Sequence, residues 1–275
     1  MNLEAILART RIDLAARRDR RPLRSVERAA ADAPAARGFA SALARSAGGI
    51  GLVAELKKAS PSAGVLRHPF DAAALAASYA RGGATCLSVL TDVPFFQGGL
   101  EVLETAASAR LPRLQKDFIL DEYQVLEGRA AGADAFLLIA EALPMDRMFT
   151  LAMLGLDLGI DVVCEAHALE RVRAVTSIAE RAPDRIVLGV NNRDLNTFMV
   201  SLETSFEALR QLPRGLLVMA ESGIRTADDV VRLRDAGARG ILVGEALLRA
   251  ADVERATREL LSGVRDLERQ GGEVG

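Results

Sequence analysis

From residue 51 onward, short apolar runs of strand length alternate with longer Ala- and Leu-rich segments in which apolar positions repeat at helical spacing. This alternation is typical of a parallel sheet whose strands are joined by helices. Eight strands are predicted, at residues 51–58, 85–91, 113–118, 134–140, 161–166, 185–192, 216–222 and 240–246. The intervening helices are predicted to begin near Asp71, Gly99, Asp121, Pro144, Ala168, Leu202, Thr226 and Glu245.

A similar turn precedes the second, fourth and eighth strands. The tripeptides GGA, AGA and AGA begin at Gly82, Ala131 and Ala236, and their glycines can adopt the left-handed conformation that ends a helix. Eight such units in about 200 residues predict an α/β fold, a (β/α)8 TIM barrel. A doubly wound open sheet is the alternative, but no GxGxxG follows the first strand.

The first fifty residues do not follow this alternation. They predict helices at 2–18, 24–32 and 36–46, separated by Pro22 and Pro34. We expect one domain over residues 1–275, with a helical extension (1–50) packed on the barrel (51–263) and a frayed tail (264–275). The Arg-rich start carries interspersed acids at helical spacing, which favours an amphipathic helix over a transit peptide.

Composition narrows the class of protein. Half of the residues are hydrophobic, 26% are charged and the net charge is -2, which indicates a globular chain with no nucleic-acid footprint. No apolar run approaches the about 18 residues of a membrane span, so a cytoplasmic location is the default prediction. A monomer is the default for the oligomeric state. Cys86 and Cys164 lie in apolar runs and are predicted to be buried thiols. With two His in the chain, no metal site is predicted.

Glu55 and Lys57 interrupt the first predicted strand with charge. Side chains two residues apart point to the same face, so both are predicted to face the barrel axis near its mouth. A structural ion pair is one interpretation, because buried charges are unfavourable unless they are paired or functional. A catalytic role is favoured, because other strands carry the same anomaly.

Polar residues also stand at the carboxyl ends of four further predicted strands, where TIM barrels hold their active sites. The lysines and glutamates among them would shift one another's proton affinities, which separates acid and base roles at neutral pH. These residues are Lys116, Glu165, Asn191 with Arg193, and Glu221 with Ser222.

Two further features of the predicted mouth suggest a ligand. Gly223 and Gly244 follow the seventh and eighth strands, where backbone amides of this fold often bind phosphate. Phe95, Phe96 and Phe118 cluster near the same rim of a chain with few aromatics. They predict an apolar wall for an aromatic substrate, and a core role for any one of them is an equal alternative.

The chain resembles the indole-3-glycerol phosphate synthase family in six segments that occur in the family's order. They are VAELKKASPSAG, SVLTDVPFFQGG, LQKDFI, GVNNRDL, AESGI and VGEALL. The amino-terminal NLEAIL and RRPLRSVE also look like the family's extra helical segment, so the resemblance covers nearly the whole chain. Where the family often has SPSKG, this chain has Ala63 in place of the loop lysine.

The resemblance implies a carboxy-lyase of tryptophan biosynthesis that needs no cofactor. Its substrate would be 1-(2-carboxyphenylamino)-1-deoxyribulose 5-phosphate, which closes to indole-3-glycerol phosphate with loss of carbon dioxide and water. By the same resemblance, Lys116 is the acid that protonates the substrate carbonyl. Lys57 pairs with the anionic substrate and is a second candidate acid for the hydroxyl lost as water, while Glu165 accepts or relays a proton.

The remaining roles implied by the resemblance are orienting and binding. Orientation of the lysines and sugar hydroxyls is assigned to Glu55, Asn191 and Glu221, supported by Arg193. Ser60 lies in the loop that is expected to close over the ligand. The anthranilate ring is expected against Phe96, Phe118 and Leu137, and the phosphate on Ser222, Gly223, Gly244 and the backbone of Glu245.

Two other classes of function are compatible with a phosphate-binding barrel. One is an isomerase of phosphoribosyl intermediates or an aldolase that uses Lys116 or Lys57 as a Schiff-base nucleophile. The other is a non-catalytic scaffold, which would be expected to have lost acid and base residues. The presence of Glu55, Lys57, Lys116 and Glu165 argues against the scaffold.

Overall fold

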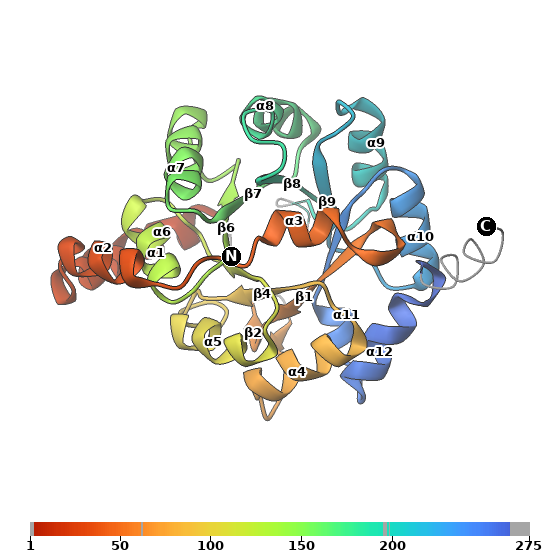
Figure 1. Cartoon of the computed structure of the whole chain (residues 1–275), viewed down its shortest axis with the longest axis horizontal. Coiled ribbons are helices and arrows are strands. Elements are labelled where there is room, and N and C mark those ends of the chain that lie inside the picture. The colour runs from red at the N-terminus through yellow and green to blue at the C-terminus, as the bar shows by residue number, and fades with distance from the viewer. Residues whose placement is uncertain (1–2, 62, 195–196, 198, 265–275) are drawn as a thin grey trace.

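The computed structural model of the chain describes residues 3–61, 63–194, 197 and 199–264. Eight parallel strands close into a barrel in the order β1-β10-β9-β8-β7-β6-β5-β4 (Figure 1). The predicted (β/α)8 barrel is therefore confirmed. The barrel strands are β1 (Gly51–Leu56), β4 (Cys86–Leu90), β5 (Arg113–Lys116), β6 (Ala135–Ile139), β7 (Asp161–Ala166), β8 (Ile186–Asn191), β9 (Leu217–Glu221) and β10 (Gly240–Val243).

Helices surround the barrel on its outside (Figure 1). Asp71, Asp121 and Thr226 each precede one of them and accept a hydrogen bond from the first turn, as N-caps do. The helices after β1 are α4 (Ala72–Gly82), α5 (Leu100–Thr105), α6 (Glu122–Ala130), α7 (Met145–Asp157), α8 (Leu169–Ala179), α9 (Glu203–Gln211), α10 (Ala227–Asp235), α11 (Glu245–Leu248) and α12 (Val253–Leu260). Short 3-10 turns lie before β1 at η1 (Ala47–Gly49) and after α5 at η2 (Ala106–Ala109).

The repeated glycine turns are confirmed as helix stops. Gly83, Gly132 and Gly237 have φ angles of 96°, 84° and 110°, which lie in the left-handed region that favours glycine. Each stop turns the chain from a helix back into the next strand. The spacing of these turns therefore sets the repeat of the barrel.

Some predicted boundaries were wrong. The first strand ends at Leu56 and not at residue 58, and a two-stranded hairpin follows, β2 (Ala59–Ser60) with β3 (Gly64–Val65). Strands this short carry no hydrophobic alternation by which a sequence could reveal them. The last predicted helix is divided into α11 and α12, because Asp252 caps a new helix by accepting the Arg255 amide at 2.9 Å.

The amino-terminal helices are α1 (Leu3–Arg20), α2 (Leu23–Asp32) and α3 (Phe39–Ala44). Helix α3 is shorter than predicted, because Gly38 precedes it with a left-handed φ of 72°. It lies across one end of the barrel (Figure 1), where Phe39 and Leu43 pack among inward-facing strand residues. The Ala40 amide donates to Asp161 Oδ2 at 2.9 Å, so α3 is fastened to the amino end of β7.

Alternation along the strands places the site at the opposite end of the barrel from α3. Val53, Leu114 and Val163 form part of the buried cluster that includes Phe39 and Leu43. Two residues further along the same strands stand Glu55, Lys116 and Glu165. Side chains two residues apart share a face, so the apolar interior gives way to a charged layer at the carboxyl ends of the strands.

Several further expectations concern the described residues. Cys86 and Cys164 are free and fully buried, as predicted. In the described part of the chain, no helix has the length and apolar character needed to cross a membrane. No group of three metal-ligating side chains is found within the same described residues. The predicted tail lies outside them from residue 265 onward.

Candidate active site

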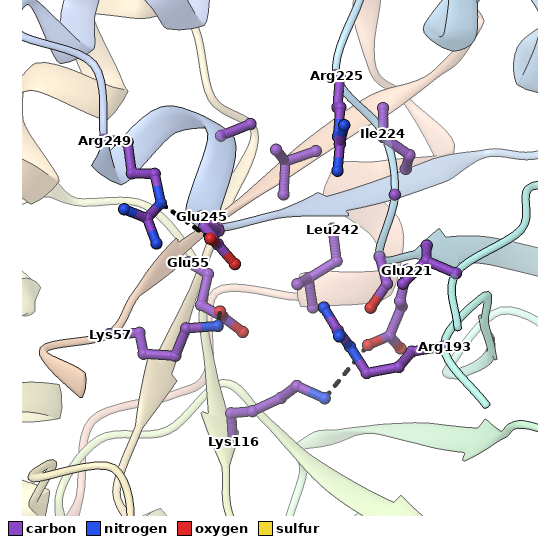
Figure 2. Close-up of a pocket in the computed structure, with 16 residues that line it drawn as sticks. Glu55, Lys57, Lys116, Arg193, Glu221, Ile224, Arg225, Leu242, Glu245 and Arg249 are labelled. Atoms are coloured by element: carbon purple, nitrogen blue, oxygen red, sulfur yellow. Dashed lines mark hydrogen bonds and ion pairs between the residues drawn. The ribbon is translucent and has the colours of Figure 1, made fainter. Parts of the chain in front are cut away.

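Two cavities open at the carboxyl end of the barrel. The larger, which we call the polar cavity, has a volume of about 420 Å³ and is lined at its centre by charged side chains (Figure 2). Its lining residues are Glu55, Lys57, Lys116, Arg193, Val200, Glu221, Ser222, Gly223, Ile224, Arg225, Leu242, Val243, Gly244, Glu245, Ala246 and Arg249.

The smaller, which we call the apolar cavity, has a volume of about 180 Å³. The rings of Phe96 and Phe118 lie in its wall with their centroids 6.3 Å apart and their planes inclined by 38°. Its lining residues are Leu3, Glu55, Lys57, Leu90, Phe96, Lys116, Asp117, Phe118, Leu137, Ile139, Glu165 and His167. Phe96, Phe118 and Leu137 thus come together as expected, whereas Phe95 lines neither cavity.

Glu55, Lys57 and Lys116 line both cavities, so the two spaces meet at these three side chains. Figure 2 shows both lysines reaching into the same space, with Glu55 and Glu221 on either side. The chain contains three lysines among 35 basic residues, and two of the three stand here. Arg stays charged at any accessible pH, whereas a lysine can lose and regain a proton. The site therefore holds the cations that are able to transfer protons.

Lys57 forms an ion pair with Glu55 Oε1, with side-chain exposures of 17% and 7%. Glu55 stands at the end of β1 and Lys57 follows directly after the strand, so both side chains stand at the barrel mouth. Gly244, on the neighbouring strand end, leaves room for the carboxylate: a Cβ there would lie 2.4 Å from Glu55 Oε1. The two residues form an ion pair, and the pair borders both cavities.

Lys116 lies between two carboxyl groups and borders both cavities. It forms an ion pair with Glu165, and its Nζ donates to Glu221 Oε2 at 3.2 Å. Burial lowers the pKa of Lys116, but the surrounding carboxyl groups, Glu165 first and then Glu221 and Glu55, outweigh burial and raise it overall. Lys116 is therefore an ammonium group at neutral pH.

Glu165 and Glu221 share one negative charge. Burial raises the pKa of both carboxyls. At Glu165 the charges of Lys116 and His167 reverse this effect and lower the pKa overall. At Glu221 the ionised Glu165 adds to burial and raises the pKa well above its usual range. A side-chain hydrogen bond between Glu221 and Glu165 raises the pKa of Glu221 further.

Asn191 lies behind this group and lines neither cavity. Its Nδ2 donates to Glu165 Oε1 at 3.1 Å, and its Oδ1 accepts the Arg193 amide at 3.1 Å. The amide thus connects the end of β8 to the carboxylate that pairs with Lys116. Asn191 can orient Glu165, and it fixes the backbone from which Arg193 reaches into the polar cavity.

The far side of the polar cavity suits an anion. Ser222 and Gly223, directly after β9, both have left-handed φ angles, 67° and 83°, so the backbone turns sharply along the cavity wall. A non-glycine residue in this region is strained, and such strain clusters at functional sites. Arg193 and Arg225 line the same cavity (Figure 2). Two guanidinium groups and a glycine-containing turn are typical of phosphate recognition.

Some functional candidates were missed by sequence reasoning. Arg249 lines the polar cavity and pairs with Glu245 Oε1 at 2.8 Å; its position four residues after Glu245 on the predicted helix was the available signal. His167 borders the apolar cavity two residues after Glu165, and strand alternation could have indicated it. Ser60, in contrast, lines neither cavity; its Oγ accepts the Ala63 amide at 3.2 Å inside the hairpin.

A parallel barrel with buried acids, bases and an anion-binding wall at its carboxyl end defines a TIM-barrel enzyme that acts on a small anionic molecule. The family model described as "Indole-3-glycerol phosphate synthase" matches residues 3–260. The chain belongs to the indole-3-glycerol phosphate synthase family, whose enzymes catalyse a decarboxylating ring closure in tryptophan biosynthesis.

Individual relatives agree with the family match. A protein from Laribacter hongkongensis, described as indole-3-glycerol phosphate synthase, is 46% identical over 264 residues, which cover 94% of this chain and 98% of the relative. Proteins of the same description from Rhodopirellula baltica and Koribacter versatilis are 43% and 45% identical over 261 residues, with the same coverage of both chains.

Solved structures support the fold alone. A thiamine phosphate pyrophosphorylase from Pyrococcus furiosus superposes with a TM-score of 0.59 at 19% identity, covering 80% of this chain and 98% of that one. A 3-hexulose-6-phosphate synthase from Salmonella typhimurium gives a TM-score of 0.61 at 15% identity, covering 79% and 99%.

Proposed function

We propose that this chain closes the indole ring of 1-(2-carboxyphenylamino)-1-deoxyribulose 5-phosphate, releasing carbon dioxide and water to give indole-3-glycerol phosphate. The observation that carries the proposal is the meeting of an apolar and a polar cavity at Lys57, Lys116 and Glu55. The substrate has the same division, because an aromatic ring and a sugar phosphate flank the atoms that react.

The aromatic ring is placed in the apolar cavity. Phe96 and Phe118 offer ring faces, and Leu137 adds an aliphatic surface from β6. Burial of an aromatic ring against such side chains contributes apolar contact and ring–ring interactions of about 0.5–1.5 kcal/mol per pair. The ring carbon that bears the carboxylate then faces the two lysines.

The phosphate is placed at the far wall of the polar cavity. The turn at Ser222 and Gly223 supplies backbone amides, and Gly244 with the Glu245 amide supplies a second group from the end of β10. Arg193 adds charge from the β8 side. Holding the substrate at both ends aligns its carbonyl with the lysines, and such positioning is a large part of catalysis.

Lys116 is assigned the first proton transfer. As the ring carbon attacks the substrate carbonyl carbon, the carbonyl oxygen takes a proton from the Lys116 ammonium, and carbon dioxide then leaves from the ring carbon. The carboxylates around Lys116 keep it protonated before the substrate arrives. An ammonium is not a nucleophile, so the same surroundings argue against a Schiff-base aldolase.

The second stage removes water. The hydroxyl formed from the carbonyl leaves with a proton, for which Lys57 is the candidate donor, and a proton leaves the carbon beside nitrogen to complete the indole. Glu165 accepts or relays protons as the ionised carboxylate beside Lys116. Glu55, Glu221 and Asn191 orient these groups, and Ser60 belongs to the hairpin beside the cavity.

Indole fluorescence tests the proposal directly. The chain has no Trp, so the protein contributes little background at the wavelengths of the indole product. Folded protein mixed with the carboxyphenylamino substrate, without added metal or cofactor, is expected to produce indole fluorescence and one carbon dioxide per indole. The absence of both products from folded protein would refute the function. Borohydride added during turnover is expected to leave the lysines unmodified, whereas a trapped adduct would support an aldolase.

A further inference from the structure

His167 is held between two carboxylates at the edge of the apolar cavity. Its Nδ1 lies 3.1 Å from Glu141 Oε2, and its Nε2 lies 3.3 Å from Glu165 Oε1. The His167 amide also donates to Glu141 Oε1 at 2.9 Å, so Glu141 is fixed to the same residue twice. The His167 side chain is 8% exposed. Lys116, Glu165, His167 and Glu141 thus form a continuous chain of contacts leading away from the lysines.

The chemistry of the two His167 contacts depends on which ring nitrogens carry a proton. A carboxylate can only accept hydrogen bonds, and a neutral imidazole has one donor and one acceptor nitrogen. Nδ1 makes a hydrogen bond with Glu141, whereas Nε2 lies at ion-pair distance from Glu165 Oε1. A ring placed between two carboxylates presents its positive charge directly to Glu165 whenever it is protonated.

Building on the function proposed above, we propose that His167 is a positioning residue: its ring, held by Glu141, keeps Glu165 ionised and directed at Lys116. Glu165 in turn holds the Lys116 ammonium in the acid form that the first proton transfer requires. A cation within about 4–6 Å lowers the pKa of a carboxyl by about one to three units. His167 acts on the reaction through Glu165 and need not touch the reacting atoms.

The surroundings of His167 are consistent with this action. The other charged groups that line the same cavity are Glu55, Lys57, Lys116 and Asp117. Lys116 is already paired with Glu165, and Lys57 with Glu55. His167 is therefore the additional positive group that directly faces Glu165, and its loss would leave the Glu165 carboxylate with Lys116 and the neutral Asn191 amide.

Turnover kinetics across pH separate this role from a structural one. His167→Phe removes both ring donors while keeping a planar ring, and His167→Gln keeps one donor without the charge. In His167→Phe we expect kcat to fall about tenfold and KM to change less than kcat. The fall is smaller than the 10²–10⁴-fold contribution of a positioned proton donor, because His167 acts only through Glu165. We expect the acidic limb of kcat to move upward by at least about one pH unit, because Glu165 loses a neighbouring cation. His167→Gln is expected to recover part of kcat without restoring the limb.

His68, the second of the chain's two histidines, provides the matched control. It lines an outer groove and neither of the two cavities, so His68→Gln is expected to leave kcat, KM and the pH profile unchanged. An increased KM with unchanged kcat in His167→Phe would show a substrate contact and overturn the positioning role. An acidic limb that stays in place would overturn it as well.

A measurement without turnover keeps this inference separate from the proposed function. Carbon-13 NMR of the side-chain carboxyls of the resting protein follows the pKa of Glu165, and Glu165→Gln assigns its signal. We expect the pKa of Glu165 to rise in His167→Phe and to stay unchanged in His68→Gln, because His167 lowers it in the parent protein. An unchanged Glu165 pKa in His167→Phe would overturn the inference, even if the protein produced indole. If no indole formed but the pKa of Glu165 rose in His167→Phe, the proposed function would fail and the role of His167 would stand.

Discussion

Asp92 offers a direct test of how this fold tolerates buried charge. It lies in the loop after β4 and is 6% exposed. Its Oδ1 accepts the amides of Phe95 at 2.8 Å and Phe96 at 3.0 Å, which shapes the turn that carries the Phe96 ring. Burial raises the pKa of Asp92 to about 6; the Phe95 amide opposes this rise and the nearby Asp117 adds to it. Asp92→Asn keeps an oxygen for both amides and removes the charge.

The magnitude follows from the difference between the folded and unfolded pKa. The ordinary value is 3.8 and the folded value is about 6; at 1.36 kcal/mol per unit, the ionised group lowers the free energy of unfolding by at most about 3 kcal/mol. Since the folded state binds the proton more tightly, this penalty is absent below about pH 4. It develops as pH rises toward 6 and is complete above that value. Asparagine has no such penalty at any pH.

Urea unfolding at pH 4 and pH 7.5 measures the effect. The free energy of unfolding of Asp92→Asn is expected to match that of the parent protein at pH 4 and to exceed it by about 2–3 kcal/mol at pH 7.5. Asp184→Asn, at an exposed position, controls for general loss of negative charge and should change stability by less than about 0.5 kcal/mol at either pH. If the free energy of unfolding rose equally at both pH values, or fell at pH 7.5, ionisation of Asp92 would not be the cause of the pH-dependent loss of stability.

Two predictions concern the lysine and its carboxylates. Lys116→Ala is expected to lower kcat at least about 10²-fold while still binding substrate. Lys58 lines neither cavity, so Lys58→Ala should retain turnover. A near-normal kcat in Lys116→Ala would show that Lys116 is not the acid. Glu221→Gln should unfold at nearly the same urea concentration as the parent protein at pH 7, because the raised pKa of Glu221 leaves it uncharged there. Glu165→Gln should lose more stability, because it leaves Lys116 without its ionised partner. Equal losses in the two glutamine variants would contradict the assigned position of the proton.

The barrel and most of its charged mouth could be predicted because strand alternation is a local property. Glu55 follows Val53 and Glu165 follows Val163 by two residues, so apolar strands that end in charge indicate which ends meet at the active site. Once the barrel closes, these side chains converge whatever the loops do. The same regularity placed Lys116 and Glu165 on one rim, whereas their ion pair is seen only in the structure.

Features that depend on loop geometry could not be predicted. Ser60 stands in a sequence motif next to the site, yet the two-residue strands of its hairpin keep it out of both cavities. Phe95 and Phe96 are neighbours in sequence, but the Asp92 turn brings only Phe96 to the apolar cavity. Such outcomes depend on individual hydrogen bonds in loops, which have no repeating pattern in the sequence.

The charge balance of the mouth explains why the ionised groups can be buried before substrate binds. Lys57 and Lys116 are cations, and three glutamates face them. The raised pKa of Glu221 removes one negative charge, so Glu55 and Glu165 balance the two lysines. Buried charges are tolerated when they are paired, and this balance leaves the resting site close to neutral. The positive charge that remains for an incoming phosphate then comes from Arg193 and Arg225, which line the same cavity. Because these guanidinium groups supply the charge for the anion, substrate binding need not discharge the Lys116 ammonium.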